Sequence, residues 1–272
     1  MVQKTFGIYS EDLNGSSLYI ETGSDYLACS CKERNTGKVA AFELFSFDKT
    51  EPENFEKLFR EVQLHSRLLT TAFDDVHCIW GYEQCVCVPN EFYSRGLAAT
   101  SMELMYGEIQ SQTVCENVIG DCVVATVINE EALAVYRKHY YVSSNMHKYY
   151  PLLKRQKLFD DDNKMHLVFN NNNFIASVYK RGALQLIQYF SYKAPEDALY
   201  FILQLAKTFA LPAAETKIYA SGLIDDSSPL YAILNAYLDN FSFEPANAES
   251  FTANDFNEYP LHYFVSFCQN DV

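Results

Sequence analysis

Apolar and polar residues alternate along several stretches of the chain, a pattern typical of strands that bury one face. The clearest examples are VAAFELFSF, which begins at residue 39, and LQLIQYF, which begins at residue 184. Two other stretches repeat their apolar residues at helical spacing. The first contains Phe55, Leu58, Phe59, Val62 and Leu69, and the second contains Ala198, Phe201, Ile202, Leu205, Ala206 and Phe209. A capping box at Thr50 and Glu53, and Pro195 in a first turn, mark the starts of these two helices.

These elements occur twice along the chain in the same order: three strands separated by turns, a helix and a further strand. The first copy is expected at 18–22, 25–32, 38–47, 53–70 and 76–81, and the second at 165–169, 174–180, 183–192, 196–210 and 216–221. Short matches support this alignment, such as SDYLACSC over NNFIASVY and VHCIWG over KIYASG. The sequence therefore predicts an internal duplication.

Residues outside the two copies form a second group of expected elements. The segment 92–160 has no counterpart in the second copy and contains a strand followed by a helix with Asn129 as its N-cap. We expect it to be a subdomain inserted into the first lobe. The polar run around 158–164 then divides the chain into lobes at 1–162 and 163–272. A helix at 228–239, a strand at FSFEP and a helix at 260–268 complete the second lobe.

Two copies of this unit resemble the duplicated ribonuclease-H-like fold shared by actin, sugar kinases and the large chaperone ATPases. The additional segment after VCVPNEF makes the chain most similar to the actin-like proteins of cell division and pilus assembly. The resemblance covers residues 15–245. It implies an α/β protein with mixed sheets, a two-lobed actin-like ATPase fold and membership of an uncharacterised bacterial family.

In nucleotide-binding members of this superfamily, three turns hold ATP in the cleft between the lobes. The first two are Asp-x-Gly turns, whose acid organises Mg²⁺ and whose glycine admits the phosphates, and the third is a Gly-Gly turn at the adenosine. In this sequence the corresponding stretches are ETGS, NNNN and SG. The candidate nucleotide-binding residues implied by the resemblance are therefore Glu21, Thr22, Gly23, Ser24, Asn170, Asn171, Asn172, Asn173, Ser221 and Gly222.

These turns depart from the superfamily pattern at the positions that carry the chemistry. Glu21 is one methylene longer than the expected aspartate, and the asparagine turn has neither acid nor glycine. We expect the asparagines to close a hairpin instead, because Asn tolerates left-handed backbone and caps its own turn. Mg²⁺ bound to phosphates uses one or two well-placed carboxylates, and phosphoryl transfer depends on positioning and electrostatics.

We therefore predict no catalytic residue, no metal site and no cofactor, and interpret the chain as a pseudo-ATPase that acts by binding or scaffolding. The alternative is a weak or specialised ATP-binding protein, ATPase or sugar-kinase-like enzyme that uses ATP and Mg²⁺ in the interlobe cleft. In that case Glu21 would serve the metal, and Gly23 and Ser24 the phosphate.

The composition of the chain disfavours some classes of binding partner. The chain of 272 residues has a formal net charge of −14, which disfavours nucleic acid and anionic membranes because both attract basic surfaces. No apolar leader or long apolar run is visible, so we expect a cytoplasmic protein without membrane insertion. The cysteine pairs at 29/31 and 85/87 fit buried reduced thiols in strands. We expect a protein partner or a homodimer.

One segment, 137–157, is locally basic and rich in tyrosine, a composition that can bind RNA or single strands. An RNA-associated function through this segment is the second alternative, against a solvated helical face whose charge is offset by nearby acids. The candidate partner-binding residues are Arg137, Lys138, Lys154, Arg155 and Lys157.

Overall fold

The computed structural model describes residues 1–48, 54–94, 97–107, 112–156, 159 and 161–268. The chain forms two compact units. The first comprises Met1–Lys154 together with Ala248–Glu258, and the second comprises Arg155–Asn247 and the segment that begins at Tyr259. The predicted lobe boundary at residue 162 stays a prediction.

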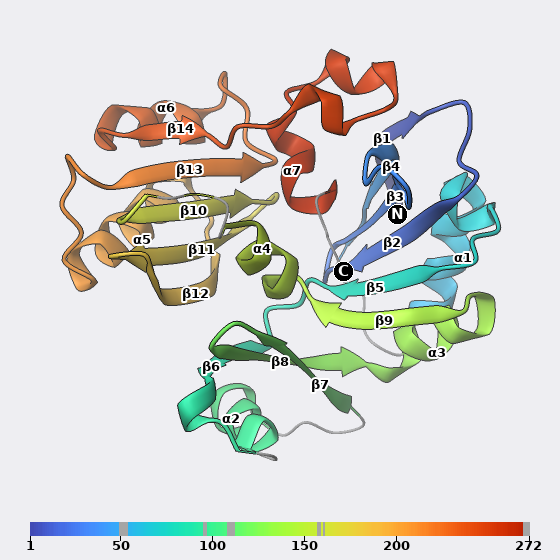
Figure 1. The fold of residues 1–272 in the computed structure, drawn as a ribbon, viewed down its shortest axis with the longest axis horizontal. Coiled ribbons are helices and arrows are strands. Elements are labelled where there is room, and N and C mark those ends of the chain that lie inside the picture. Colours follow the sequence, from blue (N-terminus) through green and yellow to red (C-terminus); the bar gives the residue numbers. More distant parts are fainter. Residues whose placement is uncertain (49–53, 95–96, 108–111, 157–158, 160, 269–272) are drawn as a thin grey trace. The chain divides into compact units, whose positions relative to one another are not determined.

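The main sheet of the first unit has six strands in the order β1-β4-β3-β2-β5-β9 (Figure 1). Their bounds are Gln3–Tyr9 (β1), Ser16–Thr22 (β2), Tyr26–Glu33 (β3), Val39–Ser46 (β4), Val76–Trp80 (β5) and Val142–His147 (β9). Strands β2, β3 and β4 form an antiparallel meander, and β5 and β9 continue the sheet parallel to β2. Strand β1 was not predicted, and it adds an antiparallel edge beside β4.

The sheet of the second unit has five strands in the order β12-β11-β10-β13-β14. Their bounds are Lys164–Phe169 (β10), Asn173–Lys180 (β11), Ala183–Ser191 (β12), Lys217–Gly222 (β13) and Phe241–Phe243 (β14). The meander of β10, β11 and β12 is antiparallel, and β13 and β14 run parallel to β10. This is the topology of β4-β3-β2-β5-β9 repeated, so the predicted duplication is confirmed.

Each unit buries one face of its sheet under helices, because alternate strand residues are apolar. In the first unit Leu18, Ile20 and Leu27 pack with residues of α1 (Phe55–His65) and α3 (Glu130–His139). In the second unit Met165 and Leu167 pack with residues of α5 (Pro195–Thr208) and α6 (Pro229–Tyr237). The remaining helices are α2 (Leu97–Tyr106), α4 (Tyr149–Gln156) and α7 (His262–Cys268), with short 3-10 turns at η2 (Leu68–Thr70), η3 (Asn90–Phe92), η4 (Ala248–Ser250) and η5 (Asn254–Glu258).

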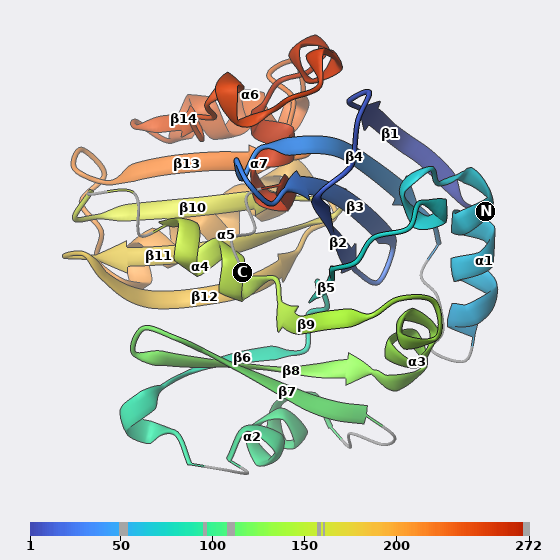
Figure 2. The ribbon, with the colours of Figure 1, turned by 45° about the vertical axis from the view of Figure 1, so that its right-hand side comes forward.

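A three-stranded sheet is inserted between β5 and α3 (Figure 2). Its strands are β6 (Cys85–Pro89), β7 (Gln112–Ile119) and β8 (Cys122–Asn129), in the order β6-β8-β7. Its small core joins Ala98 and Met102 of α2 to residues of β6 and β8. Strand β9 instead pairs with β5 of the main sheet, so the segment 92–160 is shared between the insertion and the duplicated unit.

The helix predicted at 53–70 is shorter than expected and ends at His65. The cause is Glu43, a fully buried carboxylate on β4. It accepts hydrogen bonds from the Ser66 hydroxyl and, at 2.8 Å, from the Arg67 amide, which draws the chain into an extended conformation at Ser66. The Ser66 hydroxyl then accepts from the Leu69 amide at 2.9 Å and starts the short turn η2.

Other local predictions have clear outcomes. Asn129 is the N-cap of α3, and its side chain accepts from the Ala132 amide at 3.0 Å, as expected. The expected helix near the C-terminus is present as α7. The capping box at Thr50 and Glu53 lies outside the described residues. Within the described ranges, no helix combines the length and apolar character needed to cross a bilayer.

Candidate functional site

The first candidate turn joins β2 to β3 and lies at the carboxyl end of a central strand. Glu21 and Thr22 are the last two residues of β2 and are buried, as is Gly23. The Gly23 amide donates to the Tyr26 carbonyl at 3.0 Å, which closes the turn around the half-buried Ser24. The parallel strand β5 ends alongside it, and the Gly81 amide donates to the Thr22 carbonyl at 2.8 Å.

The Glu21 carboxylate is engaged by the chain itself. Its Oε1 atom accepts from the Tyr26 hydroxyl at 2.5 Å and from the Lys148 ammonium at 2.6 Å. Lys148 follows β9 and is fully buried, so this is an ion pair removed from water. The same ammonium lies 5.5 Å from the centre of the Tyr26 ring. The other oxygen, Oε2, is buried and has no hydrogen-bond partner among the described residues.

The Tyr26 ring fills the space beside two glycines. A Cβ atom added at Gly23 would lie less than 3.0 Å from carbon atoms of that ring, and one added at Gly81 would lie less than 3.0 Å from its hydroxyl oxygen. Any larger residue at either position would therefore displace Tyr26. Gly23 and Gly81 therefore make room for a side chain of the protein itself.

Thr22 is also engaged. Its hydroxyl shares a hydrogen bond of 2.5 Å with the hydroxyl of Tyr136 on α3, and both groups are buried. Burial raises the pKa of the Tyr136 phenol well above its ordinary value. Thr22 thus ties the end of β2 to the helix that covers the sheet.

The asparagine turn joins β10 to β11 in the second unit. The Asn170 amide donates to the Asn173 carbonyl at 2.9 Å, and the Asn170 side-chain amide donates to Asn173 Oδ1 at 3.1 Å. Both of these residues are buried, whereas Asn171 and Asn172 are exposed. The expected left-handed backbone is wrong, since none of the four has a positive φ. The paired end residues close the hairpin instead.

The third candidate stretch, Ser221 and Gly222, ends β13 and lies beside the asparagine turn, because Phe169 of β10 pairs with Gly222. Gly222 has a φ of +80°, and a Cβ atom there would lie less than 3.0 Å from the Phe169 carbonyl oxygen. Both features require glycine. Ser221 is fully buried, and its hydroxyl has no partner among the described residues.

The structure therefore brings the candidates together in two separate pairs of turns. In the first unit the turn at Glu21–Ser24 meets Gly81, and in the second the turn at Asn170–Asn173 meets Gly222. In both units these are the carboxyl ends of adjacent parallel strands, where ligands bind in open α/β sheets.

Two of the basic candidates that the structure describes are paired with carboxylates. Lys138, exposed on α3, donates to Glu56 at 3.1 Å, and Arg155 forms an ion pair of 2.6 Å with the buried Glu244. Arg137 and Lys154 are exposed on their helices. Lys157 lies outside the described residues.

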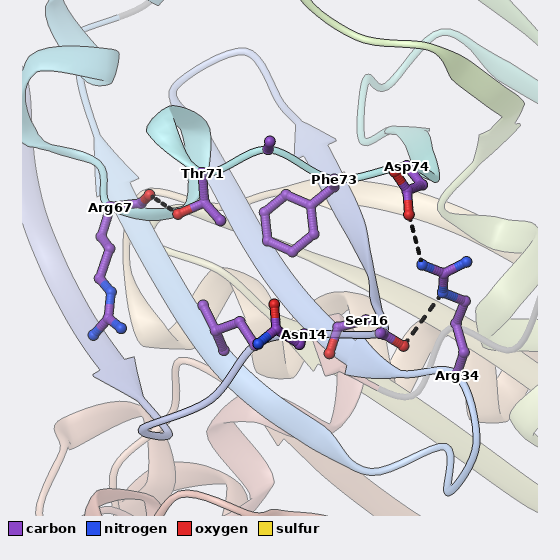
Figure 3. Close-up of a pocket in the computed structure, with 10 residues that line it drawn as sticks. Asn14, Ser16, Arg34, Arg67, Thr71, Phe73 and Asp74 are labelled. Carbon is purple, nitrogen blue, oxygen red and sulfur yellow. Dashed lines mark hydrogen bonds and ion pairs between the residues drawn. The ribbon is translucent and has the colours of Figure 1, made fainter.

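A hollow of about 430 Å³ lies elsewhere in the first unit, at the loops before β2 and β5, and Figure 3 shows the side chains that line it. No predicted nucleotide-binding residue lines it. Its most prominent cation, Arg34, is engaged by the Asp74 carboxylate at 3.3 Å and by the Gly15 carbonyl at 3.2 Å. Arg34 is therefore paired within the hollow, which Arg67 also lines.

Two residues that decide the chemistry of the first turn, Tyr26 and Lys148, were absent from the sequence-based candidates. Tyr26 was read as a strand residue, and Lys148 as one of several bases in the segment 137–157. Lys148 lies 127 positions from Glu21 along the chain. No local pattern connects residues so far apart.

The sequence was compared with known protein families. A family described as "Protein of unknown function (DUF3822)" matches residues 8–241. The chain belongs to the DUF3822 family. No curated protein matches this DUF3822 chain.

Two solved structures share the fold of this DUF3822 chain. One is a protein of Bacteroides thetaiotaomicron with an actin-like ATPase fold and unknown function, at 16% identity and a TM-score of 0.71, with 87% of this chain and 93% of that one covered. The other is the PilM–PilN type IV pilus biogenesis complex, at 12% identity and a TM-score of 0.60, with 93% and 97% covered. The DUF3822 chain has the actin-like ATPase fold, which confirms the predicted fold class.

Proposed function

We propose that this chain is a non-catalytic actin-like protein that acts by binding other proteins, as a scaffold or adaptor. The observation that carries the proposal is the buried contact of Glu21 with Lys148 and Tyr26. It occupies the position at which nucleotide-binding members of the superfamily hold Mg²⁺ and phosphate.

The electrostatic argument concerns the acid. For Glu21 to organise a hydrated Mg²⁺ through Oε1, that oxygen would have to leave Lys148, which is fully buried. Breaking a buried ion pair leaves an uncompensated charge and typically costs about 3–5 kcal/mol. A bound nucleotide would have to offset that cost before contributing any net affinity.

The steric argument concerns the glycines. Phosphate oxygens are held at such turns by backbone N–H groups that a glycine leaves open. Here the Tyr26 ring packs against both Gly23 and Gly81, and the Gly23 and Gly81 amides already donate within the chain. The turn therefore keeps its glycine, but the backbone amides are already hydrogen-bonded and the space beside the glycine is filled by the Tyr26 ring.

The second unit supports the same conclusion from a different residue type. The side chains of Asn170 and Asn173 bond to each other, and neither carries a charge. A neutral amide pair is a poor substitute for a carboxylate beside Mg²⁺. In both turns, polar side chains are therefore bonded within the chain, through Glu21 Oε1 in the first unit and through the asparagine pair in the second.

The binding role is supported by the similarity to the PilM–PilN complex, in which a protein of this fold assembles with a partner. A cytoplasmic location in a bacterium, expected from the sequence, remains part of the proposal. Nucleotide binding through Glu21 is the rival. RNA binding through 137–157 has less support, because Lys138 and Arg155 are paired with carboxylates.

Phosphate release from Mg·ATP tests the non-catalytic proposal. We expect the purified chain to release phosphate at the rate of a buffer blank, and Glu21→Ala to be indistinguishable from it. The matched control is Glu56→Ala, which removes an acid from the surface helix α1 of the same unit.

Hydrolysis above the blank that disappears in Glu21→Ala and survives in Glu56→Ala would overturn the proposal. Hydrolysis that both variants retain would come from a contaminant or another site, and would leave the Glu21 turn without a catalytic role.

A further inference from the structure

Strand β12 forms one edge of the sheet in the second unit. Among the strands that the structure describes, it pairs with β11 on one side and with no strand on the other (Figure 1). Edge strands present unpaired N–H and C=O groups, so they readily pair with another chain unless the protein protects them.

The composition of β12 offers no such protection. Its nine residues, ALQLIQYFS, contain no charged residue and no proline, although 21% of the chain is charged. About two charged residues would be expected in a strand of this length at that frequency. Natural edge strands use lysine, other inward or central charges, proline or bulges to prevent pairing.

The edges of the main sheet in the first unit show these protections. Strand β1 carries Lys4 and has an irregular register between Lys4 and Phe6. Strand β9 is covered by side chains of β7, because Cys115 and Asn117 both donate to the Asn145 carbonyl. Each of these edges is therefore blocked by charge, irregularity or cover.

The remaining edges are also blocked. Strand β14 has three residues, which is too short to offer a ladder. In the inserted sheet, β6 has five residues and ends at Pro89, and β7 carries Glu116 near its centre. Within the described part of the chain, β12 is the long edge strand that carries neither a charged residue nor a proline.

A register shift does occur in β12, but only near its start. The pairing with β11 skips Gln185 and is regular from Leu186 to Ser191. Those six residues, LIQYFS, include Gln188, whose side chain is exposed. A regular, uncharged stretch of this length is enough for a strand pair.

Aromatic side chains of β12 and of the covering helix α5 lie next to one another. Phe190 of β12 lies 5.2 Å from Phe201 of α5, measured between ring centres, and Phe201 lies 5.7 Å from Tyr200. Tyr200 is 62% exposed. A partner that paired with β12 would thus also meet apolar surface beside the strand.

We propose that β12 is a homodimer surface, on which β12 of a second copy pairs antiparallel across a two-fold axis. The lack of charged residues in β12 is the reason for choosing a second copy of the chain as the partner. Self-pairing sets only the residues near the two-fold axis beside their own copies, so a charged residue there would face a like charge, which is destabilising. An uncharged strand is the kind that tolerates this arrangement, and it does so within a chain of net charge −14.

The two-fold axis would stand perpendicular to the sheet. The two five-stranded sheets would then join into one, and the α5 helices of both copies would lie on the same face. This places the Tyr200 side chains of the pair beside the joined strands. The inference rests on the proposed function, in that it names a partner for a binding protein.

Sedimentation velocity of the full chain over a concentration series tests the proposal. We expect a dimer at about 50 μM, well above a micromolar dissociation constant. Gln188→Lys should weaken dimerisation by about tenfold or more, because it places like charges across the axis. The matched control is Gln3→Lys, an exposed glutamine on the charged edge β1, which should leave the dimer unchanged.

A chain that stays monomeric throughout the series would overturn the proposal, as would a dimer that Gln188→Lys leaves intact. If that variant fails to fold, amide hydrogen exchange of the unmodified protein decides: β12 amides should exchange faster on dilution, and exchange independent of concentration contradicts the pairing. The assay contains no nucleotide, so its outcome is separable from that of the phosphate-release test.

Discussion

At the scale of residues, the chemistry of the first turn depends on which side chains contact the Glu21 carboxylate. The sequence places Glu21 and Thr22 at the end of a strand and Gly23 in the turn after it, as the structure does, because the strand pattern is recognisable. The partners could not be predicted, since Tyr26 bends back over its own turn and Lys148 arrives from another strand.

The glycines and Tyr26 offer a sharp test of this packing. Gly81→Ala should destabilise the protein by about 1–3 kcal/mol, because its Cβ atom would overlap the Tyr26 hydroxyl. In a Tyr26→Phe background the hydroxyl is gone and the next ring atom lies 3.3 Å away, so the cost should fall. Urea unfolding of the four proteins measures this coupling.

Gly23→Ala is the matched control for that cycle. Its Cβ atom would meet ring carbons, which phenylalanine retains, so its cost should be the same in both backgrounds. Equal costs of Gly81→Ala with and without the hydroxyl would show that Tyr26 does not pack as described.

At the scale of elements, the repeated strands and the helices α3, α5, α6 and α7 could be predicted, because their apolar periodicity is strong and local. The early end of α1 could not, since it depends on Glu43 from β4. Strand β1 was also missed, and the helices α2 and α4 were not distinguished within 92–160. Their apolar faces are completed by other elements, which a single stretch of sequence does not display.

Strand β10 buries a histidine side chain that lacks hydrogen-bond partners among the described residues. His166 lies on the face opposite Met165 and Leu167, is fully buried, and its ring nitrogens have no partner among the described residues. Its ring is stacked 5.1 Å from that of Tyr219. Burial lowers the pKa of His166 to about 3, assisted by the positive charges of Lys164 and Arg155.

This pKa predicts acid sensitivity with a definite sign. In the unfolded chain histidine has a pKa of about 6.5, so as the pH falls the unfolded state binds the proton first. The stability contributed by neutral His166 is complete above that value and is lost progressively between about pH 6.5 and pH 3.

His166→Phe should flatten this dependence. Between pH 7 and pH 5, the free energy of unfolding should fall by about 1–2 kcal/mol less in the variant than in the unmodified protein. Urea unfolding at the two pH values provides the measurement, with His65→Gln on the exposed end of α1 as the control that should not change the difference. Parallel pH profiles for the unmodified protein and His166→Phe would contradict the assignment of His166 as a buried neutral group.

At the scale of the whole molecule, the duplicated topology and the similarity to actin-like proteins establish the fold of this DUF3822 chain. Fold alone does not determine function. The proposed function depends on whether the candidate turns are filled by side chains of the protein itself. In the first unit the occupants are Tyr26 and Lys148, and in the second the paired asparagines satisfy one another.

Titration calorimetry of the unmodified protein with Mg·ATP tests this central claim most directly. With nucleotide raised to millimolar concentration, the account predicts no saturable heat, because binding would have to break the buried Glu21–Lys148 pair and displace Tyr26. Saturable binding that requires Mg²⁺ and is abolished by Glu21→Ala, but not by Glu56→Ala, would contradict it.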